Sequence, residues 1–222
     1  MACVIETGAR HLLDPRIKHE PTLVSPGREA RDRRVAFTRG AIDVAVELGA
    51  ACVSLWSGVA RDAADAGTVW SRLTDALGPI LDHAARRRVV LGFEPEPGMV
   101  VDTLARAGEL LDRLGRPGHL RLTVDVGHLE CMGERPAADE LRPRAERIVN
   151  VHVDDMRACV HEHLPLGTGD VDFPAVCATI GAAGYRGGLH VELPRQSHRW
   201  LDTARESAEF LARVVIPTEA AR

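Results

Sequence analysis

Acidic and imidazole side chains, residue types that bind divalent cations, stand at the ends of four successive apolar segments. Glu94 ends "RVVLGFE", Asp125 lies in "LRLTVDV", His152 in "RIVNVHV" and Glu192 in "GGLHVEL". Three carboxylates and one imidazole suit a divalent Mn, Mg, Co or Zn ion better than a metal that prefers thiolate ligands. If the fold gathers them, the repulsion between the carboxylates favours a bound cation. The structural alternatives are arginine partners for Glu94 and Asp125, and a hydrogen-bonded core position for His152.

These four segments belong to a longer alternation of short β-branched runs and segments with helical spacing. Strands are expected at residues 2–6, 50–56, 88–94, 120–126, 147–153 and 187–193. Helices are expected at residues 28–48, 68–87, 100–114, 137–147, 173–183 and 203–214. In the first helix Val35, Ile42 and Val46 form an apolar stripe, and Arg34 belongs to the opposite, polar face. The alternation predicts an α/β fold with a parallel sheet covered by helices.

Every expected strand gives way at its C-terminal end to a chemically capable group. Besides the four residues above, Glu6 ends the first strand, Trp56 and Ser57 stand at the end of the second, His128 follows Asp125, and Asp154 follows His152. A doubly wound sheet gathers its ligand site at one switch point, whereas a barrel brings every strand end to one mouth. The pattern therefore favours a (βα)8 TIM-barrel type of fold, with residues 1–222 as a single domain.

The number of βα units departs from a complete barrel. A full barrel takes about 250 residues, and only six βα units are found in this sequence, so we expect an incomplete, N-terminally short barrel that lacks the first two units. Its open side would expose an unpaired strand edge and apolar surface, which promote association. Either a longer start lies upstream or a partner chain, as in a homo-oligomer, fills the gap.

The strand-end motifs, taken in order, carry a resemblance to a known family. "LGFEPEPG", "LTVDVGHL", "VNVHVDD", "HEHLPLGTGDVDF" and "GYRGGLHVEL" resemble motifs of the xylose isomerase-like TIM barrel superfamily, in particular its sugar phosphate isomerase/epimerase (AP endonuclease family 2) branch. This resemblance implies a divalent metal held by Glu94, Asp125, His152 and Glu192. It also implies that Glu94 and Glu192 flank the substrate as the catalytic acid/base groups.

Further side chains are expected to contact the substrate. By the same resemblance, His128 matches a substrate-contacting position, and Arg157 approximates a substrate arginine whose usual spacing is one residue longer. For His161 and His163 the metal region, the substrate and loop packing all stay open. Position after the strands adds Glu6, Arg10, Trp56, Ser57 and Glu96, for which rim or core packing is the alternative.

The segment after His152, "HEHLPLGTGD", resembles the family loop that returns to the barrel mouth. Gly167 and Gly169 would permit tight backbone geometry there, and Asp170 or Asp172 would cap the helix that follows.

This set of groups suits proton transfer at a carbon beside a carbonyl. The sequence therefore predicts a divalent-metal-dependent isomerase or epimerase of a small sugar, sugar phosphate or polyol ketone. The alternatives are an inosose-type dehydratase on the same scaffold, an endonuclease IV-like phosphodiesterase acting on abasic DNA, and an inactive truncated paralogue. No pyridine-nucleotide fingerprint or activated Ser or Cys nucleophile stands out in the sequence.

The composition of the sequence limits the classes of binding partner that we expect. The formal net charge is −4 and Lys18 is the single lysine, so the sequence lacks a concentrated basic stripe for nucleic acid. Its five scattered cysteines form no CxxC pair, which suits a reducing, cytoplasmic setting. The sequence has no apolar run near the roughly 18 residues of a membrane span. A small carbohydrate substrate is the expected partner.

Overall fold

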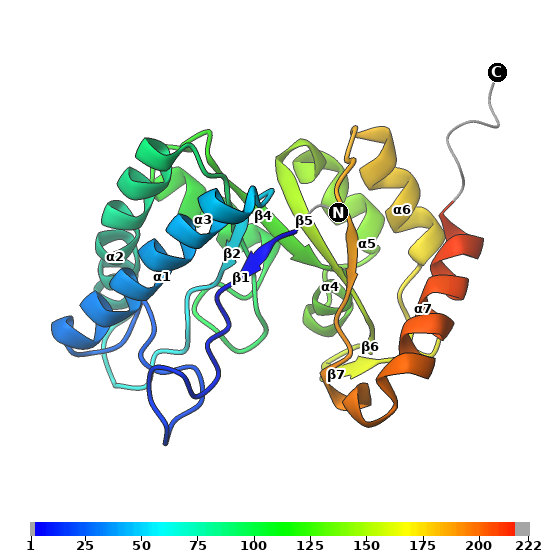
Figure 1. The fold of residues 1–222 in the computed structure, drawn as a ribbon, viewed down its shortest axis with the longest axis horizontal. Coiled ribbons are helices and arrows are strands. Elements are labelled where there is room, and N and C mark those ends of the chain that lie inside the picture. The colour runs from blue at the N-terminus through cyan, green and yellow to red at the C-terminus, as the bar shows by residue number, and fades with distance from the viewer. Residues whose placement is uncertain (1–2, 216–222) are drawn as a thin grey trace. The chain divides into compact units, whose positions relative to one another are not determined.

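The computed structural model describes residues 3–215, which alternate between strands and helices (Figure 1). The main sheet has six strands in the order β1-β2-β3-β4-β5-β8. They span Ile5–Glu6 (β1), Val53–Leu55 (β2), Leu91–Phe93 (β3), Leu120–Asp125 (β4), Ile148–Val153 (β5) and Leu189–Val191 (β8). Each lies within an expected strand, so the six predicted strands are confirmed.

Seven α-helices are found between residues 3 and 215. They span Arg28–Leu48 (α1), Ala66–Arg87 (α2), Leu104–Arg113 (α3), Val126–Met132 (α4), Ala137–Leu141 (α5), Phe173–Ala182 (α6) and Trp200–Val214 (α7). Two 3₁₀ segments span Arg142–Arg147 and Pro194–Arg199. All of the expected helices are present, and the short α4 was not expected. In this part of the chain no helix has the length and apolar character that crossing a membrane requires.

The chain divides into two compact units between Thr123 and Val124. In the first unit β1, β2, β3 and the start of β4 pair in parallel, with Val53 opposite Leu91 in the register of β2 and β3. Helices α1 and α2 pack against each other. The core of this unit is aliphatic and aromatic, with fully buried Ile42, Leu55, Leu73, Leu77, Ile80, Leu91 and Phe93.

In the second unit β5 and β8 pair in parallel, with His152 opposite His190. A two-stranded antiparallel hairpin, β6 (Asp155–Arg157) and β7 (Val160–Leu164), follows β5. The sequence predicted a loop over this stretch, which is wrong for "VHEHL" because those five residues form β7. The run is short, and three of its five residues are polar, so its pattern does not resemble a buried parallel strand.

The loop after the hairpin has the local geometry that the sequence predicted. Gly167 has a φ of +81°, and a Cβ at this position would lie 2.6 Å from the Phe210 ring. The helix cap is Asp172, whose side chain accepts a hydrogen bond from the Ala175 amide at 3.0 Å. Asp170 instead lies 3.5 Å from an arginine. Gly167 therefore permits a close approach that a side chain would prevent.

The expected polar and apolar faces of α1 are wrong at two positions. Arg34, expected on the solvent face, is only 1% exposed, whereas Val46, expected in the apolar stripe, is 40% exposed. The buried stripe of α1 consists of Arg34, Val35, Thr38, Ile42 and Ala45. Arg34 is accommodated because its guanidinium donates to the Thr7 carbonyl at 2.7 Å. A long cationic side chain can lie inside when its head group finds an acceptor.

Candidate functional site

Asp125 is the last residue of β4 and also begins the next helix. Its side chain accepts a hydrogen bond from the His128 backbone amide at 3.0 Å, so it is the N-cap of α4. The carboxylate is buried. This turn explains how β4 passes directly into a helix and places His128 one turn after Asp125.

His152 and Glu192 come from the neighbouring strands β5 and β8. The His152 Nδ1 lies 3.0 Å from the Glu192 Oε2, and its Nε2 lies 3.0 Å from the side-chain nitrogen of Asn150. The hydrogen bond with His152 lowers the pKa of Glu192, although partial burial opposes the shift. Glu192 continues the strand pairing, since its amide donates to the Val153 carbonyl at 3.1 Å.

Within the second unit the structure brings together three of the four predicted metal ligands. Asp125, His152 and Glu192 each offer a ligand atom within 4.8 Å of the others. The set combines two carboxylates with one imidazole, and all three side chains follow from strands that end on the same side of the parallel sheet. Such a donor set can hold a divalent cation.

Asp154 adds a second carboxylate beside Asp125; the sequence placed it at a strand end but assigned it no role in the site. Its side chain is 0% exposed, and its carboxylate contacts the His163 Nδ1. Burial, together with the charge of Asp125, raises the pKa of Asp154 to about 11. Burial also opposes ionisation of Asp125, but the nearby imidazoles of His128 and His152 bring the pKa of Asp125 below its usual value. The signal was the sequence "HVDD", in which Asp154 shares the strand face of His152.

Three histidines form a second cluster in the same unit. His128 comes from α4, and His161 and His163 come from β7. Their ring centroids are separated by 5.1, 5.9 and 5.3 Å, and each ring offers a nitrogen within 4.8 Å of the others. Burial lowers the pKa of His161 to about 4 and also lowers that of His163. The structure therefore brings His161 and His163, both predicted as candidate site residues, to His128.

Arg157 is engaged by its own hairpin and the loop that follows. Its Nη2 donates to the Thr168 carbonyl at 2.8 Å, and its Nη1 lies 3.5 Å from Glu162. The side chain is about half exposed. These contacts hold Arg157 on the hairpin surface, where it supports the loop that contains Thr168.

The remaining predicted residues belong to the first unit. Glu94 is buried directly after β3, and its amide donates to the Leu55 carbonyl at 2.9 Å. Trp56 is buried directly after β2. Glu6 and Arg10 are exposed, and the Arg10 carbonyl accepts a hydrogen bond from the His19 amide at 2.6 Å. Glu94 and Trp56 thus follow strands whose C-terminal ends point the same way. Glu6 is the last residue of β1, and Arg10 lies in the segment that follows β1.

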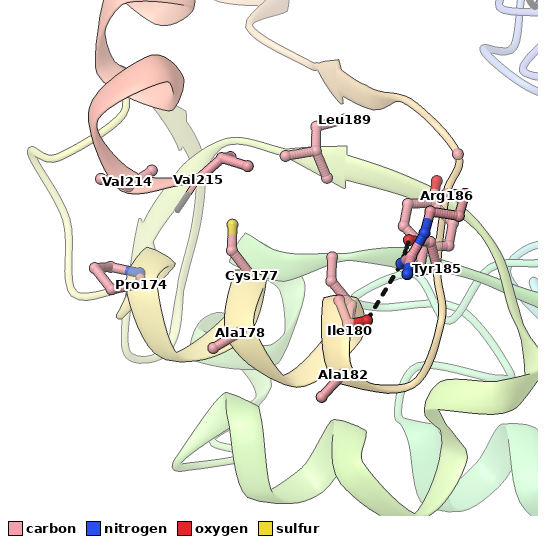
Figure 2. Close-up of a pocket in the computed structure, with 12 residues that line it drawn as sticks. Pro174, Cys177, Ala178, Ile180, Ala182, Tyr185, Arg186, Leu189, Val214 and Val215 are labelled. Carbon is pink, nitrogen blue, oxygen red and sulfur yellow. Dashed lines mark hydrogen bonds between the residues drawn. The ribbon is translucent and has the colours of Figure 1, made fainter. Parts of the chain in front are cut away.

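The second unit also contains an apolar pocket of roughly 390 Å³, shown in Figure 2. Its lining comes from α6, the turn after α6, β8 and the end of α7, and includes Pro174, Cys177, Ile180, Tyr185, Leu189 and Val214. None of the acidic or imidazole residues described above lines it. Figure 2 shows mainly apolar side chains in this pocket, and the lining contains no carboxylate or imidazole.

Comparison with known proteins places the chain in a family. The family described as xylose isomerase-like TIM barrel matches residues 6–214. The chain belongs to this family. The resemblance inferred from the strand-end motifs is confirmed, and the six parallel strands with their helices are an incomplete TIM barrel.

The individual relatives include sugar epimerases. The L-ribulose-5-phosphate 3-epimerase UlaE of Salmonella paratyphi C (strain RKS4594) is 30% identical over 142 residues, which cover 64% of this chain and 47% of the relative. The chain thus spans about half the length of this curated relative. The solved 3-keto-D-glucoside 4-epimerase YcjR from E. coli has a TM-score of 0.77 at 18% identity, covering 87% of this chain and 76% of that one. The IOLI protein, solved with a binding zinc atom, has a TM-score of 0.71 at 20% identity, covering 85% and 71%.

Proposed function

We propose that this chain is a divalent-metal-dependent isomerase or epimerase that moves a proton at the carbon beside the carbonyl of a small sugar, sugar phosphate or polyol ketone. The observation that carries the proposal is the cluster of buried Asp125 and His152 with half-buried Glu192 in the second unit. Membership of a family that contains sugar epimerases supports an enzyme of this class.

We further propose Glu94 as the fourth ligand. It is buried and follows β3, the strand that pairs in parallel with β4, whose last residue is Asp125. Neighbouring parallel strands deliver their C-terminal residues to the same edge of a sheet. The strand-end motif around Glu94 supports the same role. The complete set would then be Glu94, Asp125, His152 and Glu192.

The residues present fit a divalent cation on chemical grounds. Asp125 and Asp154 are buried carboxylates in one cluster, and two such groups repel each other strongly unless one is protonated or a cation lies beside them. Oxygen donors with one imidazole suit Mn, Mg, Co or Zn. The zinc bound by the IOLI protein supports a metal in this fold. When bound, the cation supplies positive charge for the substrate oxygens.

The two glutamates are the proposed acid/base groups. The hydrogen bond with His152 keeps the pKa of Glu192 below its ordinary value, so Glu192 is ionised near neutral pH and able to accept a proton from carbon. Glu94 is the proposed second acid/base group, which would return or remove a proton. We propose that further side chains contact the hydroxyl groups and the sugar ring of the substrate. They are His128, His161, His163, Arg157, Trp56, Glu6 and Arg10.

The experiment is solvent exchange in D₂O. The metal-loaded chain is incubated with ketoses, their phosphates and inosose, and deuterium at the carbon beside the carbonyl is measured by mass spectrometry and NMR. Glu192→Gln should suppress incorporation by at least about 100-fold. Glu209→Gln, at an exposed position on α7, is the matched control and should behave as the wild type. Absence of deuterium and of product across the panel would refute the proposal.

A second function is favoured by one observation, the three-imidazole cluster of His128, His161 and His163. Three imidazoles suit an additional zinc, and the phosphodiesterase alternative uses more than one cation. Metal analysis separates the two functions: one cation per chain supports the isomerase, whereas two or three cations with cleavage of abasic DNA support the nuclease. Loss of water from inosose would instead identify the dehydratase.

A further inference from the structure

Arg34 is the largest fully buried side chain in the part of the chain that the structure describes. It belongs to α1, in the first unit, and its head group reaches the C-terminal ends of β1 and β2. The Nη2 donates to the Thr7 carbonyl at 2.7 Å. The guanidinium carbon lies 4.4 Å from the centre of the Trp56 ring and 5.4 Å from that of Phe37. The head group therefore lies over the Trp56 ring and donates to a backbone carbonyl.

Burying the charged head group of an arginine in this way costs free energy. Burial lowers the pKa of Arg34 to about 10, with Glu20 partly opposing the shift, so the side chain stays charged at neutral pH. Its Nη1 is buried and has no hydrogen-bond acceptor. A well-packed apolar side chain in place of a buried charge is often neutral or stabilising. Packing alone therefore does not account for an arginine at this position.

The contacts of Arg34 converge on Trp56. One contact of the indole is the guanidinium of Arg34, and another is the edge of the His19 ring, 5.3 Å away at an interplanar angle of 86°. The same arginine holds the Thr7 carbonyl, while the Thr7 hydroxyl donates to the Ser54 carbonyl at 2.8 Å. Arg34 thus links the indole to the C-terminal ends of β1 and β2.

We propose that Arg34 is a positioning residue that fixes the orientation of Trp56 for contact with the sugar. This inference rests on the proposed function, in which Trp56 contacts the substrate. A planar guanidinium stacks on an indole and donates in a fixed fork, which an ammonium group cannot reproduce. Lysine at this position would keep the charge and most of the volume but would not hold the ring in the same orientation.

The test follows Trp56 directly. The protein has three tryptophans, so labelling with 5-fluorotryptophan gives three ¹⁹F signals, and Trp56→Phe assigns one of them. Arg34→Met should shift and broaden the Trp56 signal and leave the other two in place. Arg39→Met, an exposed position on the same helix, is the matched control and should leave all three unchanged.

The kinetic arm separates positioning from general stability. With the sugar that the wild type turns over, Arg34→Met should raise KM roughly tenfold and change kcat by less than about twofold. Arg34→Lys should restore neither KM nor the Trp56 signal. If the wild type turns over no sugar, the proposed function fails, and the Trp56 signal still decides the role of Arg34.

Three results would overturn the inference. One is an unchanged Trp56 signal in folded Arg34→Met. Another is full recovery of signal and KM by Arg34→Lys. The third is failure of both variants to fold, which would make Arg34 a structural requirement of the first unit.

Discussion

Replacing Gly127 with alanine should destabilise the second unit by about 2–4 kcal/mol. Gly127 lies in the first turn of α4, against the strand segment that contains Asp154 and Met156. An added Cβ would lie 2.8 Å from the Met156 Cγ and 3.0 Å from the Asp154 Cγ, with the Asp154 Oδ1 nearer still. Asp154 cannot move aside easily because it is fully buried and contacts His163.

The expected loss of unfolding free energy in Gly127→Ala combines three effects. Inserting a methyl group into a packed core costs about 1–3 kcal/mol, and disturbing the contact between Asp154 and His163 adds about 1–3 kcal/mol, as for a buried polar group that loses its partner. The helix preference of alanine over glycine offsets about 1 kcal/mol. In urea unfolding the midpoint should fall by roughly 1 M.

The matched control is Gly108→Ala in α3. An added Cβ there meets nothing within 4 Å, so only the helix preference remains and the variant should be stabilised by up to about 1 kcal/mol. Equal stability of Gly127→Ala and the wild type, within about 0.5 kcal/mol, would refute the steric reasoning. It would show that the Asp154 carboxylate relaxes freely.

Three other outcomes are expected. Replacing either His152 or Asp125 with alanine should abolish stoichiometric metal, measured by plasma mass spectrometry, while the helical CD signal stays largely intact; retention of metal by both variants would show the ligand set to be wrong. Asp172→Ala should cost about 1 kcal/mol in unfolding free energy because α6 loses its side-chain cap, and no loss would mean that the cap contributes little. Burial lowers the pKa of His19 from 6.5 to about 4. The contribution of neutral His19 to the free energy of unfolding should therefore be fully present above pH 6.5 and decline as the pH falls towards 4. An NMR titration giving His19 an ordinary pKa would contradict this.

The sheet was predictable because buried parallel strands leave a clear pattern. Each of the six strands is a short β-branched run, and its C-terminal end carries a polar residue that the apolar run makes conspicuous. The same logic found Asp125, His152 and Glu192, which the structure gathers in one unit. The helix caps Asp65, Asp125 and Asp172 follow similar local rules.

The errors occurred where tertiary contacts override the local pattern. Helix α4 is buried on nearly all sides and contains a glycine, so it has no amphipathic period to detect. The hairpin strand β7 is short and polar. Arg34 was assigned to the solvent because its acceptor, the Thr7 carbonyl, is 27 residues away in sequence. Asp154 was given no role because its importance depends on a second carboxylate from another strand.

The N-cap role of Asp125 has an evolutionary consequence. Asparagine caps a helix about as well as aspartate but lacks the negative charge that a cation requires. A lineage that no longer needed the metal could therefore accept asparagine at this position and keep α4 intact, whereas an alanine would lose both roles at once. A single carboxylate thus serves the start of a helix and, in the proposed function, the retention of a cation, and asparagine is the substitution that would separate the two.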